Sequence, residues 1–377
     1  MPTSLLLRNA RIVTPQGVMD QAWVQIDGTR ITAVGAGNRE GGVDLEGQYL
    51  TPGFVDLHIH GGAHASFQHA DADASRNIAA LHLQHGTTTL LAGLGARPVE
   101  ELEASAQSLV PLVEEGVLAG IFYEGPYLSN TRRGAQDPRT LRDPDTGEMQ
   151  RLLEAGEGTV RMVTIAPELP GALDLIRTVV GAGAAAAVGH TDASYEQARA
   201  AFDAGASVAT HLFNGMRPIH HRDPGPVIAA LNDERVVCEL VADGFHLHDA
   251  TLRFVFEAAG SSRVALVTDA IEATGVGDGH YRHGDMVIDV VDGMAVLEDR
   301  SSIAGSTLTT DKALRRAVLH AGIPLHHAVT ALTTTPARVL GLDGQIGVIG
   351  AGAQADLVVL DDSLSVKTVY RQGRPIG

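Results

Sequence analysis

Cysteine is nearly absent from this chain of 377 residues, since Cys238 is the only one. A disulfide framework needs pairs of cysteines and a thiolate metal cluster needs several, so the sequence excludes both. Cys238 lies in an apolar, strand-like run, where a lone thiol is usually a small buried hydrophobic side chain. Any metal site in this chain must therefore use nitrogen and oxygen ligands.

Basic residues are scarce relative to acidic ones. The chain has 28 Lys and Arg against 45 Asp and Glu, which gives a formal net charge of −17. A field of this sign repels nucleic acids and anionic membrane surfaces, so we expect neither as a partner. An anionic small substrate would need a local cationic side chain to bind it.

Long hydrophobic runs are missing too. No stretch is long enough to span a bilayer, and Met1–Arg8 has neither the basic start nor the small-residue cleavage site of a secretory leader. Hydrophobic residues make up 44% of the chain and charged ones 19%, a balance typical of a globular protein. We therefore expect a cytoplasmic enzyme or binding protein.

Short runs of alternating apolar and polar residues mark both ends of the chain. In residues 5–50, turn signals such as Pro15–Gly17 separate these runs, a pattern typical of a small antiparallel β unit. Residues 355–370 have the same texture. We expect residues 1–50 and 345–377 to form one small β-sandwich domain that is split across the sequence.

Between these ends, in residues 51–344, strand-like runs alternate with Ala-rich helical segments. The strand candidates are 51–60, 87–91, 118–123, 160–165, 184–188, 207–210, 236–241 and 264–267. The helix candidates include 74–85, 100–115, 171–181, 195–204 and 249–259. Eight strand-then-helix units predict an α/β fold of the (β/α)8 TIM-barrel type, whose sites lie at the carboxyl ends of the strands. A doubly wound sheet is the alternative, although no Gly-x-Gly-x-x-Gly follows the first strand.

Six of the strand candidates end in side chains that can bind a metal ion. These side chains, in chain order, are His58, His60, Glu124, His190, His211, His246 and Asp269. Each alone would more often be a structural group, but a barrel brings all of them to one mouth. Such nitrogen and oxygen ligands suit Zn²⁺, Fe²⁺, Mn²⁺ or Co²⁺, with an open position for water.

Longer motifs around these strand ends resemble a known family. The His-x-His after the first strand, the later histidines and the final Asp are similar to those of the amidohydrolase superfamily. Within it, the chain resembles the N-acetylglucosamine-6-phosphate deacetylase family at 123–128, 189–193, 210–216, 221–225, 242–246 and 267–270. The resemblance continues through 303–306 and 335–338, so it covers essentially the whole chain.

The resemblance implies a metal-dependent hydrolase of linear amides. It would convert N-acetylglucosamine 6-phosphate to glucosamine 6-phosphate and acetate, in amino-sugar catabolism or cell-wall recycling. Glu124, His190 and His211 would bind the main cation, with Zn²⁺ or Fe²⁺ expected before Mn²⁺ or Co²⁺. Asp269 would be the general base, taking a proton from water and delivering it to the amine leaving group. Because His58 and His60 are retained, the site could bind either one cation or two. Glu124 would bridge the second cation to the first, and Asp269 would contact it.

The resemblance also implies the substrate contacts. Arg222 would pair with the 6-phosphate from the second subunit of a homodimer, since a bidentate guanidinium suits a phosphate dianion. His246 would hydrogen-bond a sugar hydroxyl. The remaining pocket residues would be Ala135, Asn214, Gly215, Ile303, Ala304 and Gly305.

Residue 136 departs from the family pattern. Family members carry a His here that polarises the acetyl carbonyl, whereas this chain has Gln136. A neutral amide can still donate to the oxyanion, and losing such a donor outright typically costs about 2.7–4 kcal/mol. We therefore keep a second hypothesis, in which the protein is a related amidohydrolase that acts on another N-acyl amine or a cyclic amide. A non-catalytic scaffold is the third, and it predicts a broken ligand set, which this sequence does not have.

Overall fold

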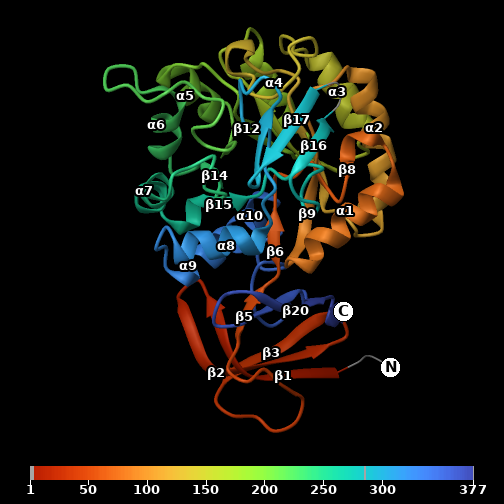
Figure 1. Ribbon diagram of the computed structural model, residues 1–377, viewed down its shortest axis with the longest axis vertical. Helices are drawn as coiled ribbons and strands as arrows, with labels where there is room; N and C mark the ends of the chain where they lie inside the picture. The colour runs from red at the N-terminus through yellow and green to blue at the C-terminus, as the bar shows by residue number, and fades with distance from the viewer. Residues whose placement is uncertain (1–3, 284–285, 377) are drawn as a thin grey trace.

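The computed structural model describes residues 4–283 and 286–376. Figure 1 shows two stacked parts, a barrel above and a smaller sheet below, and both chain ends lie in the lower part. Residues 1–3 and 377, which the sequence places in the end domain, lie outside the described residues.

Eight parallel strands, hydrogen-bonded in sequence order, form the barrel. They are β6 (Phe54–Asp56), β9 (Thr87–Leu94), β10 (Gly120–Glu124), β11 (Val160–Ile165), β12 (Ala185–Val188), β13 (Val208–Ala209), β14 (Val237–Val241) and β15 (Val264–Val267). A parallel bridge between Ile59 and Ala270 joins the chain beyond the first strand to the chain beyond the last. The predicted α/β barrel is therefore confirmed.

These strands are buried on both faces, which is why they read as continuous apolar runs in the sequence. Helices cover the outside of the barrel (Figure 1). They are α1 (Ala72–Gln84), α2 (Val99–Glu114), α3 (Thr146–Ala155), α4 (Ala172–Gly181), α5 (Tyr195–Asp203), α6 (Gly225–Leu231), α7 (Asp249–Ala259), α8 (Thr310–Leu319), α9 (Leu325–Leu332) and α10 (Thr334–Val339). The five helix predictions agree with α1, α2, α4, α5 and α7 within two residues at each end.

The prediction of one strand over 51–60 is wrong. The structure has two strands there. β5 (Tyr49–Pro52) pairs with β1 (Ser4–Thr14) and β19 (Leu357–Leu360) of the lower sheet rather than with the barrel. The chain changes sheets at Gly53, where an added Cβ would lie 2.1 Å from Oγ1 of Thr88. Only a glycine lets the backbone pass this close to Thr88. The chain crosses from the lower sheet to the barrel at this residue.

The lower sheet also has eight strands and takes them from both chain ends. They are β1 (Ser4–Thr14), β2 (Gly17–Asp27), β3 (Arg30–Ala36), β4 (Val43–Asp44), β5, β19 (Leu357–Leu360), β20 (Val366–Arg371) and β21 (Arg374–Ile376). Ile12 and Val24 from one end pack in the same cluster as Leu357 and Tyr370 from the other. The two ends meet in one β unit as expected, and their division from the barrel at residues 50 and 345 stays a prediction.

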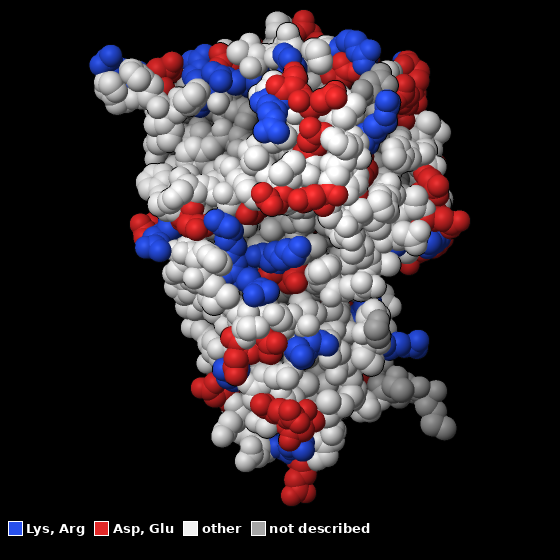
Figure 2. Space-filling view, viewed as in Figure 1, with Lys and Arg blue, Asp and Glu red and all other residues white. Residues whose placement is uncertain are grey.

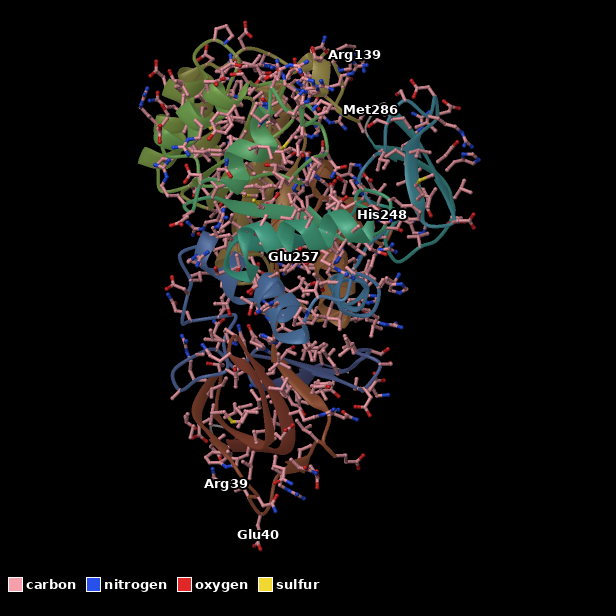
Figure 3. All side chains as sticks on the ribbon, turned by 90° about the vertical axis from the view of Figure 1, so that its left-hand side faces the viewer. Arg39, Glu40, Arg139, His248, Glu257 and Met286 are labelled. Carbon is pink, nitrogen blue, oxygen red and sulfur yellow. The ribbon has the colours of Figure 1, made fainter. Side chains whose placement is uncertain are left out.

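A three-stranded sheet follows the last barrel strand, and the sequence patterns did not predict it. It consists of β16 (Gly279–His283), β17 (Met286–Val291) and β18 (Met294–Leu297). Figure 3 shows this sheet, marked by Met286, standing out beside the barrel. Its buried face packs Ile288 and Val290 against Ile271 and Ala304 from loops at the barrel mouth. A short hairpin of β7 (Gly61–Gly62) and β8 (Ala65–Ser66) lies near the same mouth.

Charged side chains of both signs are scattered over the face seen in Figure 2, between broad uncharged areas. No helix of the part that the structure describes is long and apolar enough to cross a membrane.

Candidate active site

A cavity of about 240 Å³ opens at the carboxyl ends of the barrel strands. Thirteen of the fifteen predicted site residues line it: His60, Glu124, Ala135, Gln136, His190, His211, Asn214, Gly215, His246, Asp269, Ile303, Ala304 and Gly305. The two exceptions are His58, which is fully buried, and Arg222, which lies elsewhere on the surface. Gly134, Ile271, Ile288 and Ser302 complete the lining and were not predicted.

Glu124 stands at the centre of the predicted metal ligands. Its Oε1 lies 3.1 Å from Nε2 of His190 and 3.0 Å from Nε2 of His211, and these two nitrogens are 3.1 Å apart. All three side chains are buried at the ends of β10, β12 and β13. These atoms are close enough to share one cation.

A second group of ligand atoms also meets the carboxylate of Glu124. Nε2 of His58 is 3.1 Å from Nε2 of His60 and 3.4 Å from Oε1 of Glu124. Oδ1 of Asp269 lies 3.5 Å from His58 and 3.4 Å from His60. The carboxylate of Glu124 therefore faces both groups, as a bridging ligand would.

The protonation pattern of the histidines tests whether a cation fits. Nδ1 of His190 lies 2.9 Å from the carbonyl oxygen of Arg132, to which it must donate its hydrogen. In the neutral ring this leaves a lone pair on Nε2, facing the carboxylate of Glu124. Two sets of electron pairs in contact repel each other, and a divalent cation between them makes the contact favourable. The residues present thus fit a divalent metal ion.

Backbone strain accompanies these ligands. His190, His211 and Asp269 have φ angles of 44°, 26° and 52°, in the left-handed region that side chains other than glycine rarely adopt. Residues in such conformations persist where the surrounding structure holds them, and they gather at functional sites. Here the strain turns the three side chains from strand ends into one cavity.

The electrostatics of the site favour positive charge among the ligands. Burial alone would lower the pKa of His58, but the carboxylates of Asp269, Glu124 and Glu239 outweigh it and raise this pKa to about 9. Burial would raise the pKa of Asp269, yet His58 and His60 hold it well below its usual range. The carboxylates are therefore ionised. Their negative charge is balanced either by protonated histidines or by a metal ion.

Gln136 is held in a definite orientation. Its Oε1 accepts a hydrogen bond from the backbone N–H of Ala96 at 2.9 Å, and its Nε2 donates to Oε2 of Glu124 at 2.7 Å. The amide thus turns its donor end toward the ligand group, and a second hydrogen on Nε2 is not used by Glu124.

His246 reaches the site with the help of a residue that sequence reasoning missed. Its Nδ1 lies 2.7 Å from Oδ2 of Asp243, and its Nε2 lies 3.8 Å from Oδ2 of Asp269. The carboxylate of Asp243 also accepts the backbone N–H of His246, so it orients the ring through two contacts. The Asp-Gly-x-His spacing was a signal for this pairing.

Arg222 is the predicted site residue that the structure does not bring to the cavity. It is exposed, and its guanidinium lies 2.6 Å from Nε2 of the neighbouring His221. No lysine or arginine is found among the described residues that line the cavity. A phosphate bound there would therefore find no guanidinium or ammonium group of the same chain in the described lining.

Comparisons with known proteins agree with this geometry. The model of the amidohydrolase family matches residues 49–376. An N-acetylgalactosamine-6-phosphate deacetylase from Escherichia coli O157:H7 is 32% identical, over 98% of this chain and 98% of its own length. An N-acetylglucosamine-6-phosphate deacetylase from Vibrio furnissii is 33% identical, over 86% of this chain and 82% of its own.

Solved structures give the same result. A mutant of N-acetyl-D-glucosamine-6-phosphate deacetylase from Mycobacterium smegmatis, in complex with N-acetyl-D-glucosamine-6-phosphate, matches with a TM-score of 0.96 and 46% identity over 99% of both chains. An N-acetylglucosamine-6-phosphate deacetylase from Thermotoga maritima matches with a TM-score of 0.90 and 30% identity, over 98% of this chain and 99% of its own length. The chain therefore belongs to the amidohydrolase family and, within it, to the N-acetylglucosamine-6-phosphate deacetylases and their close relatives.

Proposed function

We propose that this protein is a metal-dependent hydrolase that deacetylates N-acetylglucosamine 6-phosphate, releasing acetate and glucosamine 6-phosphate. The observation that carries the proposal is the carboxylate of Glu124, shared between two groups of histidines and opposite Asp269 in one cavity. The names of the similar proteins identify the substrate class. Zn²⁺ or Fe²⁺ as the native cation, and a cytoplasmic location, stay predictions.

The roles of the residues follow from their positions. Glu124, His190 and His211 would hold the first cation, which supplies Lewis-acid chemistry by acidifying a water molecule and polarising a carbonyl group. Asp269 takes the proton from the attacking water and later delivers it to the nitrogen of the leaving amine. This second transfer matters because an unprotonated amine is a poor leaving group.

Gln136 and His246 complete the contacts with the substrate. The unused N–H of Gln136 donates to the oxyanion that forms when water adds to the acetyl carbonyl. His246, oriented by Asp243, hydrogen-bonds a sugar hydroxyl. Ala135, Asn214, Gly215 and the turn at 303–305 line the rest of the sugar site.

The 6-phosphate is best bound by a guanidinium or ammonium group, and no described lysine or arginine lines the cavity of a single chain. We infer that Arg222 supplies it from the partner in a homodimer, because Arg222 is exposed and free of any carboxylate contact among the described residues. A guanidinium binds a phosphate dianion through two parallel hydrogen bonds. The exposed Ile219, three residues earlier in the same loop, suits burial at such an interface.

A panel of substrates tests this function against its rivals. The proposal predicts acetate release from N-acetylglucosamine 6-phosphate and much slower release from the unphosphorylated sugar. N-acetylgalactosamine 6-phosphate belongs in the panel because one of the relatives carries the name of that activity. A preference for an N-acyl amine without phosphate, or for a cyclic amide, would reject the proposal in favour of another amidohydrolase reaction.

A further inference from the structure

Glu239 is a charged residue in the interior of the barrel, for which neither the sequence motifs nor the proposed reaction supplies a role. It lies in the middle of β14, is 0% exposed, and is the one charged residue of that strand. An ionised carboxylate in such a place is costly unless positive charge or several donors compensate it. The contacts of Glu239 show how little compensation the surrounding side chains and backbone supply.

The hydrogen bonds of Glu239 are few. Its Oε2 lies 3.2 Å from Nδ1 of His58 and 3.4 Å from the backbone nitrogen of His211. Its Oε1 has no hydrogen-bond partner among the described residues. Within the same described part of the chain, His58 is also the only ion-pair partner of Glu239. Two donors at these distances leave much of the carboxylate charge uncompensated.

The contact with Glu239 decides which nitrogen of His58 faces the other candidate metal ligands. Because Nδ1 donates its hydrogen to Glu239, the neutral ring carries its lone pair on Nε2. That atom points toward the carboxylates of Glu124 and Asp269, at 3.4 and 3.5 Å. The ring of Phe122 packs edge-on against His58, with centroids 4.7 Å apart, and limits its rotation.

We propose that Glu239 is a positioning residue, which holds His58 with Nε2 ready to bind a second divalent cation. The other ligands of that cation are His60, Glu124 and Asp269. Glu239 holds Nδ1 of His58, so a cation held by Nε2 would compensate its charge through the ring. Carboxylates in this position raise the basicity of the ligand and fix its tautomer. The inference rests on the proposed metal-dependent function and adds what secures the second site.

Titration with metal alone tests the proposal without any substrate. The full chain is stripped with a chelator and titrated with Zn²⁺ against a chromophoric competitor, which gives both stoichiometry and affinity. The wild type should bind two Zn²⁺. Glu239→Gln keeps the size of the side chain and removes its charge, and it should weaken only the second Zn²⁺, by about 10–100-fold. Circular dichroism and urea unfolding of the stripped proteins show whether the variant folds.

Two controls separate positioning from a general effect of removing a buried carboxylate. Asp311→Asn breaks a carboxylate–imidazole pair that is less buried, in which Oδ1 lies 3.1 Å from Nδ1 of His85. That pair lies at the opposite end of the barrel, beside the start of β9, and its loss should leave both Zn²⁺ affinities unchanged. In a His58→Asn background, which should already lack the second Zn²⁺, Glu239→Gln should cause no further loss of metal affinity.

Several results would overturn the proposal. These are a wild type that binds a single Zn²⁺, a Glu239→Gln protein with two unchanged affinities, and an equal loss at both sites, which would indicate a structural role. Acetate release measured on the same samples keeps the proposed reaction separate. A wild type with two bound Zn²⁺ and no deacetylation would reject the substrate, while the metal titration would still decide the role of Glu239.

Discussion

At the scale of single residues, the chemistry depends most on Asp269. It is held ionised by His58 and His60, and it faces the cavity from the end of β15. We expect Asp269→Asn to bind N-acetylglucosamine 6-phosphate and to lose turnover, with kcat lower by at least about 10²–10⁴-fold, because the amide cannot accept the proton of water. Calorimetric binding and acetate release measure the two effects separately. Turnover near that of the wild type would remove Asp269 from the mechanism.

Gln136 gives a second prediction at this scale. If its free N–H stabilises the oxyanion, Gln136→Ala should lower kcat by about 10²–10³-fold with a smaller effect on KM. Gln136→His restores the residue of other family members and should retain activity. Because Gln136 also donates to Glu124, metal content must be measured on both variants. An unchanged kcat in fully metallated Gln136→Ala would show that the oxyanion has another donor.

Residues that we propose to contact the cation or the substrate were more predictable from the sequence than residues that act through another side chain. His190, His211 and Asp269 each follow an apolar strand, so their position in the sequence indicates their position in the barrel. Asp243 and Glu239 leave a weaker signal, because each contacts an imidazole rather than the cavity. A charged residue inside an apolar strand was the one available hint for Glu239.

At the scale of elements, the turn at 303–305 positions the general base. Gly305 has a φ of 61°, and an added Cβ would lie 2.4 Å from Cγ2 of Ile271 and 2.9 Å from the carbonyl oxygen of Asp269. We expect Gly305→Ala to displace Asp269, lower kcat, and destabilise the fold by about 1–3 kcal/mol through overpacking. Urea unfolding and acetate release measure both effects.

Gly293 provides the matched control for Gly305. Its φ is 79°, so it has a similar backbone conformation, but an added Cβ would meet nothing nearer than Oγ1 of Thr307 at 3.6 Å. Gly293→Ala should therefore carry the cost of the left-handed conformation alone and leave kcat unchanged. Equal losses of activity in the two variants would show that crowding around Asp269 is not the cause.

Sequence patterns predicted best those elements whose surroundings are uniformly apolar. Strands such as β11 and β15 are buried on both faces and were predicted at their observed bounds. The split at Gly53 was missed because the predicted strand was started at Thr51 and carried across Pro52 and Gly53, whereas β5 and β6 belong to different sheets. The three-stranded sheet of β16–β18 was missed because only one of its faces is buried, by a few residues such as Ile288.

At the scale of the whole molecule, the proposed contribution of Arg222 makes the dimer the active unit. Arg222→Ala should raise KM for the phosphorylated sugar by about 10-fold or more and leave metal content unchanged, because a charge-assisted pair with phosphate is lost. KM for the unphosphorylated sugar should not change. Steady-state kinetics with the two sugars measures this difference, and an equal rise in both KM values would contradict a phosphate contact.

Mixed dimers test whether Arg222 acts across the subunit interface. A subunit with Arg222→Ala keeps its own Asp269, and an Asp269→Asn partner can supply the missing arginine. At limiting substrate the Arg222→Ala protein should keep at most about a tenth of wild-type activity, and the Asp269→Asn protein almost none. Random mixing of the two, after dissociation and reassembly, should raise activity to about a quarter of the wild type, since half the dimers then contain one complete site. Absence of any restored activity in verified mixed dimers would place Arg222 outside the partner's site.

The most direct test of the central claim is acetate release from N-acetylglucosamine 6-phosphate by the purified protein, with metal content quantified on the same sample. The account predicts one acetate for each glucosamine 6-phosphate formed, activity that is lost on chelation, and activity that returns when Zn²⁺ or Fe²⁺ is added. A fully metallated protein that releases no acetate from this substrate would contradict the account, and it would point to Gln136 as the mark of a different substrate.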